Sequence, residues 1–327
     1  MIRILNFDDS IVSQKKLLAR FDHTIVDFKM IGPQSRFWLN KKEADEIQAS
    51  LDPSQRHLVT FLGSGDFHQV SSLLISQFEE PISVIVFDHH PDWDILPPKL
   101  HCGSWVTETL KQKNVKKMIL LGVSSHDIST LGIQTGNLSS LKDDRVEIYP
   151  YFHKPTRTFR RVPENKSIRV SQGLLSTQIE WQEIRNENIG KFFSKILQRM
   201  ESKRVYVSID KDCLKAKYSL TNWEEGFFEL EELLMFLKLI KKNLEIVGLD
   251  IVGDYSVPGV KGWIKRTLSA LDHPKDFSAK RKAKELIREV NEQTNIRILE
   301  ALSERDEDYS ENNQKSAKHS GPADGLF

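Results

Sequence analysis

Acidic and imidazole side chains crowd the end of one apolar segment of this chain. Residues 82–87 (ISVIVF) form a short, unbroken run rich in β-branched side chains, which predicts a strand buried on both faces of a parallel sheet. The run ends abruptly in Asp88, His90 and Asp92, which would point the same way if the backbone stayed extended. Two carboxylates and an imidazole aimed at one point repel one another and lose hydration unless a cation lies between them, so the segment indicates a divalent metal site.

Two further strand ends carry the same types of side chain. Residues 58–62 run into GSGDFH, which contains His68, and residues 204–209 run into Asp210 and Asp212. One Asp or His after a strand is usually a cap or turn residue. The carboxyl ends of parallel strands, however, meet at one edge of a sheet. Four carboxylates and two imidazoles exceed what one metal with an open position would use, so the set indicates two metals that share bridging carboxylates. The mixture of donors suits Mn²⁺, with Fe²⁺, Co²⁺, Ni²⁺ and Zn²⁺ as alternatives.

Strands alternate with helices along most of the chain. Apolar runs predict strands at residues 2–7, 23–31, 58–62, 84–87, 117–123, 145–149, 204–209 and 245–252. Helices are expected at residues 41–50, 69–78, 105–113, 188–200, 229–242 and 277–302. This alternation predicts βαβ units and a mainly parallel sheet.

We expect residues 1–303 to form one α/β domain. Residues 151–187 are the least regular part, and we interpret them as a long insertion that could lie over the rim of the active site. The polar residues 304–327 are expected to be a disordered tail.

The composition is that of an ordinary soluble protein. Of the 327 residues 39% are hydrophobic and 28% charged, and the formal net charge of +1 favours neither nucleic acid nor an anionic membrane as a partner. Only two cysteines occur, which fits a reducing compartment. No apolar run reaches the length of about 18 residues that a membrane span needs. We therefore expect a cytoplasmic protein that acts on a small molecule, with homo-oligomerisation left open.

The three acidic segments together resemble the metal motifs of the arginase/ureohydrolase family, whose fold is shared with histone-deacetylase-like enzymes. The family forms GGDH, DAHxD and SxDxD correspond here to GSGDFH, DHHPD and SIDKD, in the same order. The resemblance covers roughly residues 58–252 and depends on the set of three, because each motif alone is weak. It implies a three-layer α/β/α fold with a parallel central sheet and two Mn²⁺ ions. The implied metal ligands are His68, Asp88, His90, Asp92, Asp210 and Asp212. By analogy Asp88 and Asp210 would bridge the metals, His68 and Asp92 would complete one of them, and His90 and Asp212 the other.

The chain also departs from the family pattern. The first motif has one more residue between Asp66 and the histidine, and Gly253 stands where guanidine-hydrolysing members carry a glutamate. Asp254 follows and could replace that glutamate if the backbone turned differently. Asp94 replaces an asparagine that helps hold the substrate carboxylate in arginase, and it would suit a cation better.

The resemblance also implies an activity. A hydroxide that bridges the metals would attack a guanidino, amidino or amide carbon of a small molecule and break a C–N bond other than a peptide bond. His101 is the candidate for proton transfer, by analogy with a mobile histidine of the family; a surface loop histidine is the alternative. Asp94 and Asp254 are the candidate substrate-binding residues. The alternatives are a deacetylase-like amidohydrolase of acylated amines and a non-catalytic metal-binding member of the family.

Overall fold

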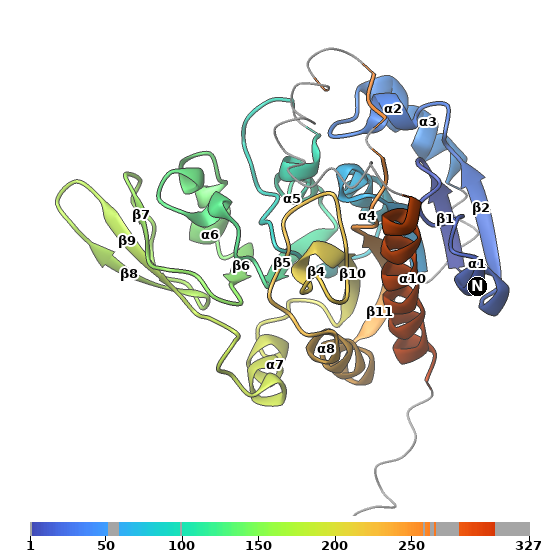
Figure 1. Cartoon of the computed structure of the whole chain (residues 1–327). Helices are drawn as coiled ribbons and strands as arrows, with labels where there is room; N and C mark the ends of the chain where they lie inside the picture. The colour runs from blue at the N-terminus through green and yellow to red at the C-terminus, as the bar shows by residue number, and fades with distance from the viewer. Residues whose placement is uncertain are drawn as a thin grey trace, which may run out of the picture.

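Eight strands form one parallel sheet in the computed structural model, which describes residues 2–51, 59–98, 100–257, 259–261, 265 and 281–304. The order across the sheet is β2-β1-β3-β11-β10-β4-β5-β6 (Figure 1). The strands are β1 (Ile2–Asn6), β2 (His23–Asp27), β3 (Val59–Gly63), β4 (Ile82–Phe87), β5 (Val115–Leu121), β6 (Val146–Tyr149), β10 (Arg204–Asp210) and β11 (Glu245–Val252). Every neighbouring pair is parallel, so the predicted fold class is confirmed.

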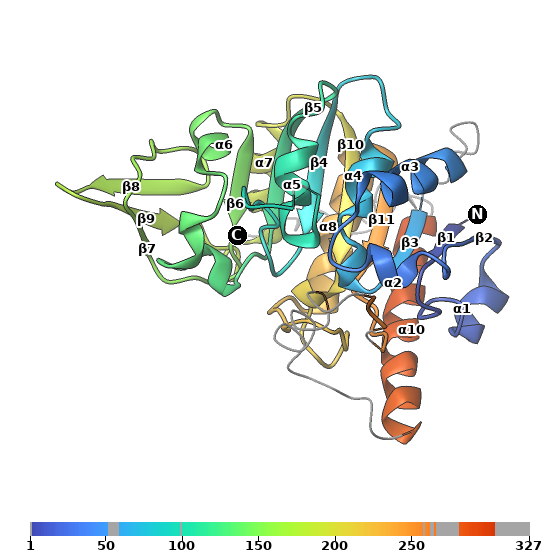
Figure 2. The ribbon, with the colours of Figure 1, turned by 90° about the horizontal axis from the view of Figure 1, so that it is seen from above.

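Helices cover both faces of this sheet, and the alternating strand side chains supply a separate core to each (Figure 2). One core joins Ile85, Phe87 and Val207 to α1 (Lys15–Arg20), α7 (Ile189–Leu197), α8 (Leu230–Asn243) and α10 (Arg281–Ser303). The other joins Val84 and Val86 to α3 (Lys41–Ser50), α4 (Val70–Ile75), α5 (Trp105–Thr109) and α6 (Leu138–Lys142). Burial on both faces explains why the central strands are continuous apolar runs in the sequence.

Residues 151–187 are more regular than expected and occupy another place. They contain a three-stranded antiparallel sheet of β7 (Thr156–Thr158), β8 (Ile168–Gln172) and β9 (Thr177–Trp181). Figures 1 and 2 both show this sheet beyond the edge strand β6, at one end of the molecule. None of the described residues that line the cavity at the candidate site comes from this insertion. The expected position over the site rim is therefore corrected.

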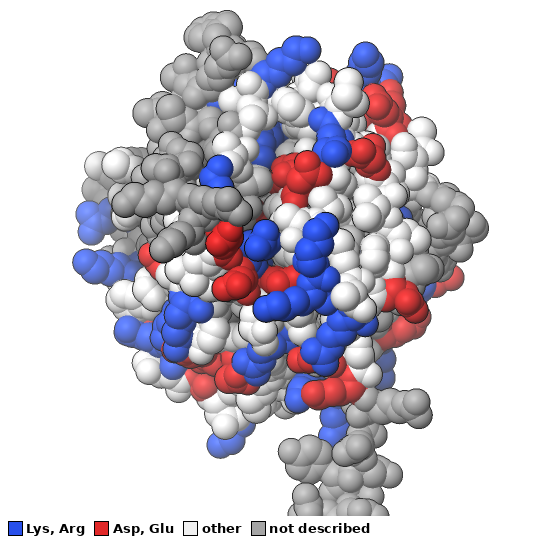
Figure 3. All heavy atoms as spheres, turned by 45° about the vertical axis from the view of Figure 1, so that its right-hand side comes forward, with Lys and Arg blue, Asp and Glu red and all other residues white. Residues whose placement is uncertain are grey.

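Several helices are shorter than predicted, and the short helices α1, α2 (Gly32–Ser35) and α6 were not predicted. One or two turns leave too few residues for a helical period to show in a sequence. Of the predicted C-terminal helix, residues 277–280 lie outside the described part of the chain, as do residues 305–327 of the predicted tail. None of the described helices is both long and apolar enough to cross a membrane. On the face shown in Figure 3, basic and acidic side chains are interspersed over the described residues.

Candidate metal centre

The three acidic segments lie together because their strands are close in the sheet. β3, β10 and β4 end at the same edge, with β11 between β3 and β10. A cavity of about 370 Å³ opens at these strand ends. It is lined by all six side chains that the motifs singled out: His68, Asp88, His90, Asp92, Asp210 and Asp212. The sheet topology therefore produces the convergence that was expected from the sequence.

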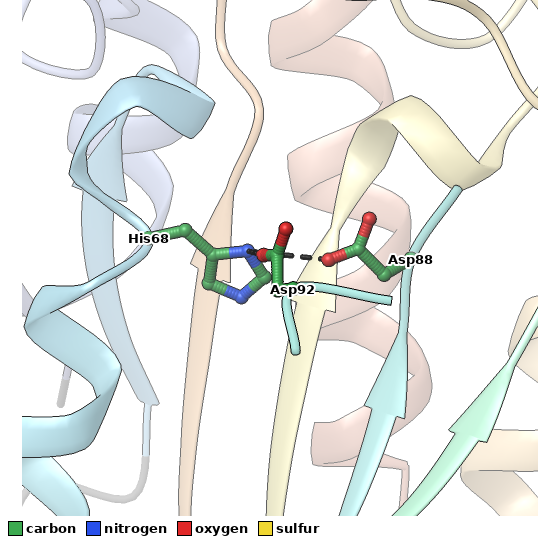
Figure 4. A group of neighbouring side chains, drawn as sticks. All are labelled: His68, Asp88 and Asp92. Atoms are coloured by element: carbon green, nitrogen blue, oxygen red, sulfur yellow. Dashed lines mark ion pairs between the residues drawn. The ribbon is translucent and has the colours of Figure 1, made fainter. Parts of the chain in front are cut away.

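His68 lies in the first of two groups that could hold a metal ion, together with Asp88 and Asp92 (Figure 4). Its Nδ1 is 3.3 Å from Asp88 Oδ2 and 3.1 Å from Asp92 Oδ2. The additional residue of the first motif is taken up by a single 3₁₀ turn, Gly65–Phe67, which the Ser64 hydroxyl caps by accepting from the Asp66 N–H. His68 follows this turn directly, so the longer spacing still brings its ring into the cluster.

The second group consists of Asp88, His90 and Asp212. His90 Nδ1 is 2.9 Å from Asp212 Oδ2 and 3.7 Å from Asp88 Oδ1. Asp88 therefore belongs to both groups and presents one oxygen to each histidine. This is the placement that a bridging carboxylate requires.

Asp210 and Asp92 complete the cluster by local turns of the backbone. Asp210 Oδ2 is 3.6 Å from His68 Nδ1, and its Oδ1 accepts from the Asp212 N–H. The backbone at Asp92 is not extended as assumed from the sequence, because Asp92 has a φ of +45°. Its side chain nevertheless faces His68, and Oδ2 accepts a hydrogen bond from the Trp105 indole at 2.7 Å.

The chemistry of this donor set fits divalent metal ions. Asp88 is 1% exposed, and its Oδ2 accepts no hydrogen bond from any described residue. Burial and the charges of Asp212 and Asp88 raise the pKa of Asp210 well above its usual range. Burial alone would lower the pKa of His68, but Asp88 and Asp92 outweigh it and raise that pKa. Both shifts reflect several buried carboxylates that face one another, an arrangement that a bound divalent cation would stabilise.

A second layer of buried groups orients His68. Its Nε2 is 2.9 Å from the Ser208 hydroxyl, which donates to Asp250 Oδ1 at 2.8 Å. The Tyr206 hydroxyl donates to the other oxygen of Asp250 at 2.7 Å. Such an outer partner fixes the ring so that Nδ1 faces the metal position.

The cavity wall carries two acidic side chains outside the ligand set, Asp94 and Asp127. Asp94 Oδ1 accepts from the Thr135 hydroxyl at 2.8 Å. Burial, together with the charge of Asp127, raises the pKa of Asp94 to about 6. Asp127 was not proposed from the sequence, in which it belongs to a polar loop after β5 with no motif. No lysine or arginine occurs among the described residues that line the cavity.

His101 also lines the cavity, as expected for a proton-transfer residue. Its Nε2 is buried and has no hydrogen-bond partner within the described ranges. Burial lowers the pKa of His101, which favours the neutral form of the ring.

Asp254 is not among the residues that line this cavity; it lies in a buried polar cluster behind it. Its Oδ2 is 2.8 Å from Lys211 Nζ, and its Oδ1 accepts from the Gln14 amide at 2.6 Å. This position does not support the predicted role in holding a substrate. Gly253 has a φ of +86°, and a Cβ there would lie 2.4 Å from Asp210 Oδ1. A glutamate at position 253 would therefore disturb Asp210, one of the candidate ligands.

Comparisons with known proteins agree with the fold described above. An uncharacterized protein of Thermotoga maritima is 27% identical over 254 residues, covering 77% of this chain and 79% of the relative. Proclavaminate amidino hydrolase from Streptomyces clavuligerus has a similar structure, with a TM-score of 0.54 and 13% identity over 90% of this chain and 91% of that one. The Mn²⁺ structure of the N114H variant of Trypanosoma cruzi formiminoglutamase gives a TM-score of 0.51 and 11% identity, over 90% and 93% of the two chains. A model of the Arginase family matches residues 18–253, and the chain belongs to that family.

Proposed function

We propose that this protein is a binuclear metal hydrolase that breaks a non-peptide C–N bond of a small molecule. The observation that carries the proposal is the pair of ligand groups that share Asp88, both of them in the wall of one cavity. His68 and Asp92 would hold one ion and His90 and Asp212 the other, with Asp88 and Asp210 between them. Mn²⁺ is the favoured ion because it suits mixed carboxylate and imidazole donors, and a structural relative carries it.

The metal pair and the protein side chains would have separate roles in the reaction. A metal pair held there would supply an activated water molecule and polarise the bond that is attacked. His101, which lines the cavity and whose Nε2 has no hydrogen-bond partner among the described residues, would take up and return a proton during the reaction. Buried Ser208 and Asp250 would keep His68 in place while the charge in the site changes.

The cavity wall favours a substrate with a positive charge. Asp94 and Asp127 add carboxylates to a wall that has no cationic side chain among the described residues. Phe37, Trp38 and Trp223 supply aromatic surface to the same cavity, on which a cationic group can pack. Away from the metal centre, the free carboxylate of an amino acid would find no cationic side chain among the described residues of the wall and would face Asp94 and Asp127, so L-arginine is not the favoured substrate.

The crowding at Gly253 favours a second candidate reaction, the deacylation of an acylated amine. A guanidinium bound in the cavity would need a carboxylate partner close to the reacting carbon. Gly253 has no room for that side chain, and Asp254 is paired with Lys211 instead. A neutral amide does not need such a partner, so the absence of the glutamate would weaken substrate binding less in this reaction than in guanidine hydrolysis.

One screen tests both reactions. Urea release from L-arginine and agmatine would be measured beside amine release from acylated polyamines, with Mn²⁺ present. Asp88→Ala and chelator-treated protein are the controls for metal dependence. We expect metal-dependent turnover of a substrate with a cationic tail. Efficient release of urea from L-arginine would contradict the substrate assignment, and turnover that survives loss of the metal would contradict the mechanism.

A further inference from the structure

The two histidines of the metal centre differ in what holds their outer nitrogens. Ser208 and Asp250, both fully buried, support Nε2 of His68. Nε2 of His90 instead faces Glu224, whose Oε2 is 3.7 Å away. Glu224 is half exposed and belongs to the loop between the third motif and α8. The Glu224 carboxylate takes no part in the proposed reaction described above.

The backbone on either side of Glu224 is firmly attached to the site. The Asn222 amide donates to the Ser256 carbonyl at 2.8 Å, and the Trp223 indole donates to Asp66 Oδ1 at 3.0 Å. On the other side, the Gly226 N–H donates to the Asp212 carbonyl at 2.6 Å. Glu224 lies between these attachments, so its carboxylate is kept near the metal centre although its side chain is exposed.

Metal binding would determine which ring nitrogen of His90 carries the hydrogen. A metal ion takes a lone pair from Nδ1, the atom that faces Asp212, so a neutral ring must carry its hydrogen on Nε2. That N–H then points towards Glu224. A separation of 3.7 Å is longer than a direct hydrogen bond, but a half-exposed glutamate has the rotational freedom to close it. The same oxygen is 3.7 Å from Nε2 of His89, so the carboxylate stands between the two rings.

We propose that Glu224 is a positioning residue that orients His90 and thereby retains the second metal ion. The inference rests on the proposed function, because it requires two bound ions. The role proposed for Glu224 means that the two metal positions differ in what supports their histidine ligands. One depends on a buried pair, Ser208 and Asp250, and the other depends on a carboxylate that solvent can reach.

The test is metal binding by the full chain loaded with Mn²⁺, measured by equilibrium dialysis and by electron paramagnetic resonance. Glu224→Ala should lower the affinity for one of the two ions about 10- to 100-fold and leave the affinity for the other unchanged. The coupled signal of a manganese pair should then give way to that of a single ion. Glu224→Gln keeps a hydrogen-bond acceptor, so its affinity for the second ion should lie between those of Glu224→Ala and wild type. Glu225→Gln removes the same charge one residue further along and should bind both ions normally.

Double variants identify which ion is affected. In an Asp212→Ala background, where the His90 position is already impaired, Glu224→Ala should have no further effect on the remaining ion. In an Asp92→Ala background, Glu224→Ala should weaken binding of the remaining ion by about the same 10- to 100-fold. Two ions held with unchanged affinity by Glu224→Ala would overturn the role of Glu224 and leave the proposed function intact. A folded wild-type protein that binds no metal would overturn both.

Discussion

Asp254→Ala should destabilise the protein strongly, because it would leave the Lys211 ammonium buried without a partner. The Lys211 side chain is 0% exposed and the Asp254 side chain 1% exposed. Removing one partner of a buried ion pair typically costs about 3–5 kcal/mol of the free energy of unfolding. The Gln14 amide would also lose its acceptor on Asp254. We expect a total loss of about 3–5 kcal/mol, since these contributions are not additive.

The measurement is urea unfolding followed by tryptophan fluorescence. Lys238→Ala breaks the exposed pair with Glu304 and should leave the unfolding midpoint unchanged. Adding Lys211→Met to Asp254→Ala should recover part of the lost stability, because the unpaired charge is then gone. A loss below about 1 kcal/mol for Asp254→Ala would refute the structural role given to this pair. A rise in KM with no loss of stability would instead favour the substrate-binding role expected from the sequence.

Three other predictions concern the site and one buried pair. Asp88→Ala should abolish binding of both metal ions, whereas Asp212→Ala should mainly weaken one, as measured by elemental analysis after Mn²⁺ loading; equal, mild losses would contradict the bridging role of Asp88. Asp94→Asn and Asp127→Asn should each raise KM for a cationic substrate about 10- to 100-fold, the value of a hydrogen bond to a charged group, and should affect a neutral analogue much less. Burial alone would lower the pKa of Lys117, but its pairs with buried Glu147 and with Asp144 outweigh it and raise that pKa above 10.5. The stability from these pairs is therefore present below pH 10.5 and lost as the pH rises through the folded-state pKa, so the stability difference between wild type and Lys117→Met should stay constant below pH 10.5 and shrink above it; a difference that stays constant above pH 10.5 would refute this.

The sequence predicted those parts of the molecule that depend on local pattern. The buried run before Asp88 and the similar runs before His68 and Asp210 became strands of one parallel sheet, with β11 between β3 and β10. Their convergence follows from parallel pairing, which brings strand ends to one edge. Position and spacing along the chain were therefore sufficient to predict that these six side chains lie together.

The sequence did not indicate features that depend on which way a side chain turns. Asp254 follows a strand end that lies among the strands of the candidate ligands, but its side chain pairs with Lys211 and does not line the cavity. Asp127 follows an ordinary polar loop, and only the tertiary structure places it in the cavity wall beside Asp94. The strands of residues 151–187 are three to five residues long, which is too short for an alternating pattern to be distinguished from a loop.

The central claim is that two divalent ions bind between the six converging side chains, and anomalous X-ray scattering from crystals grown with Mn²⁺ tests it most directly. We expect two anomalous peaks about 3.5–4 Å apart, with Asp88 in contact with both. One peak should lie beside His68 and the other beside His90. The absence of manganese from this cluster in well-ordered crystals, or a single ion bound elsewhere, would contradict the claim.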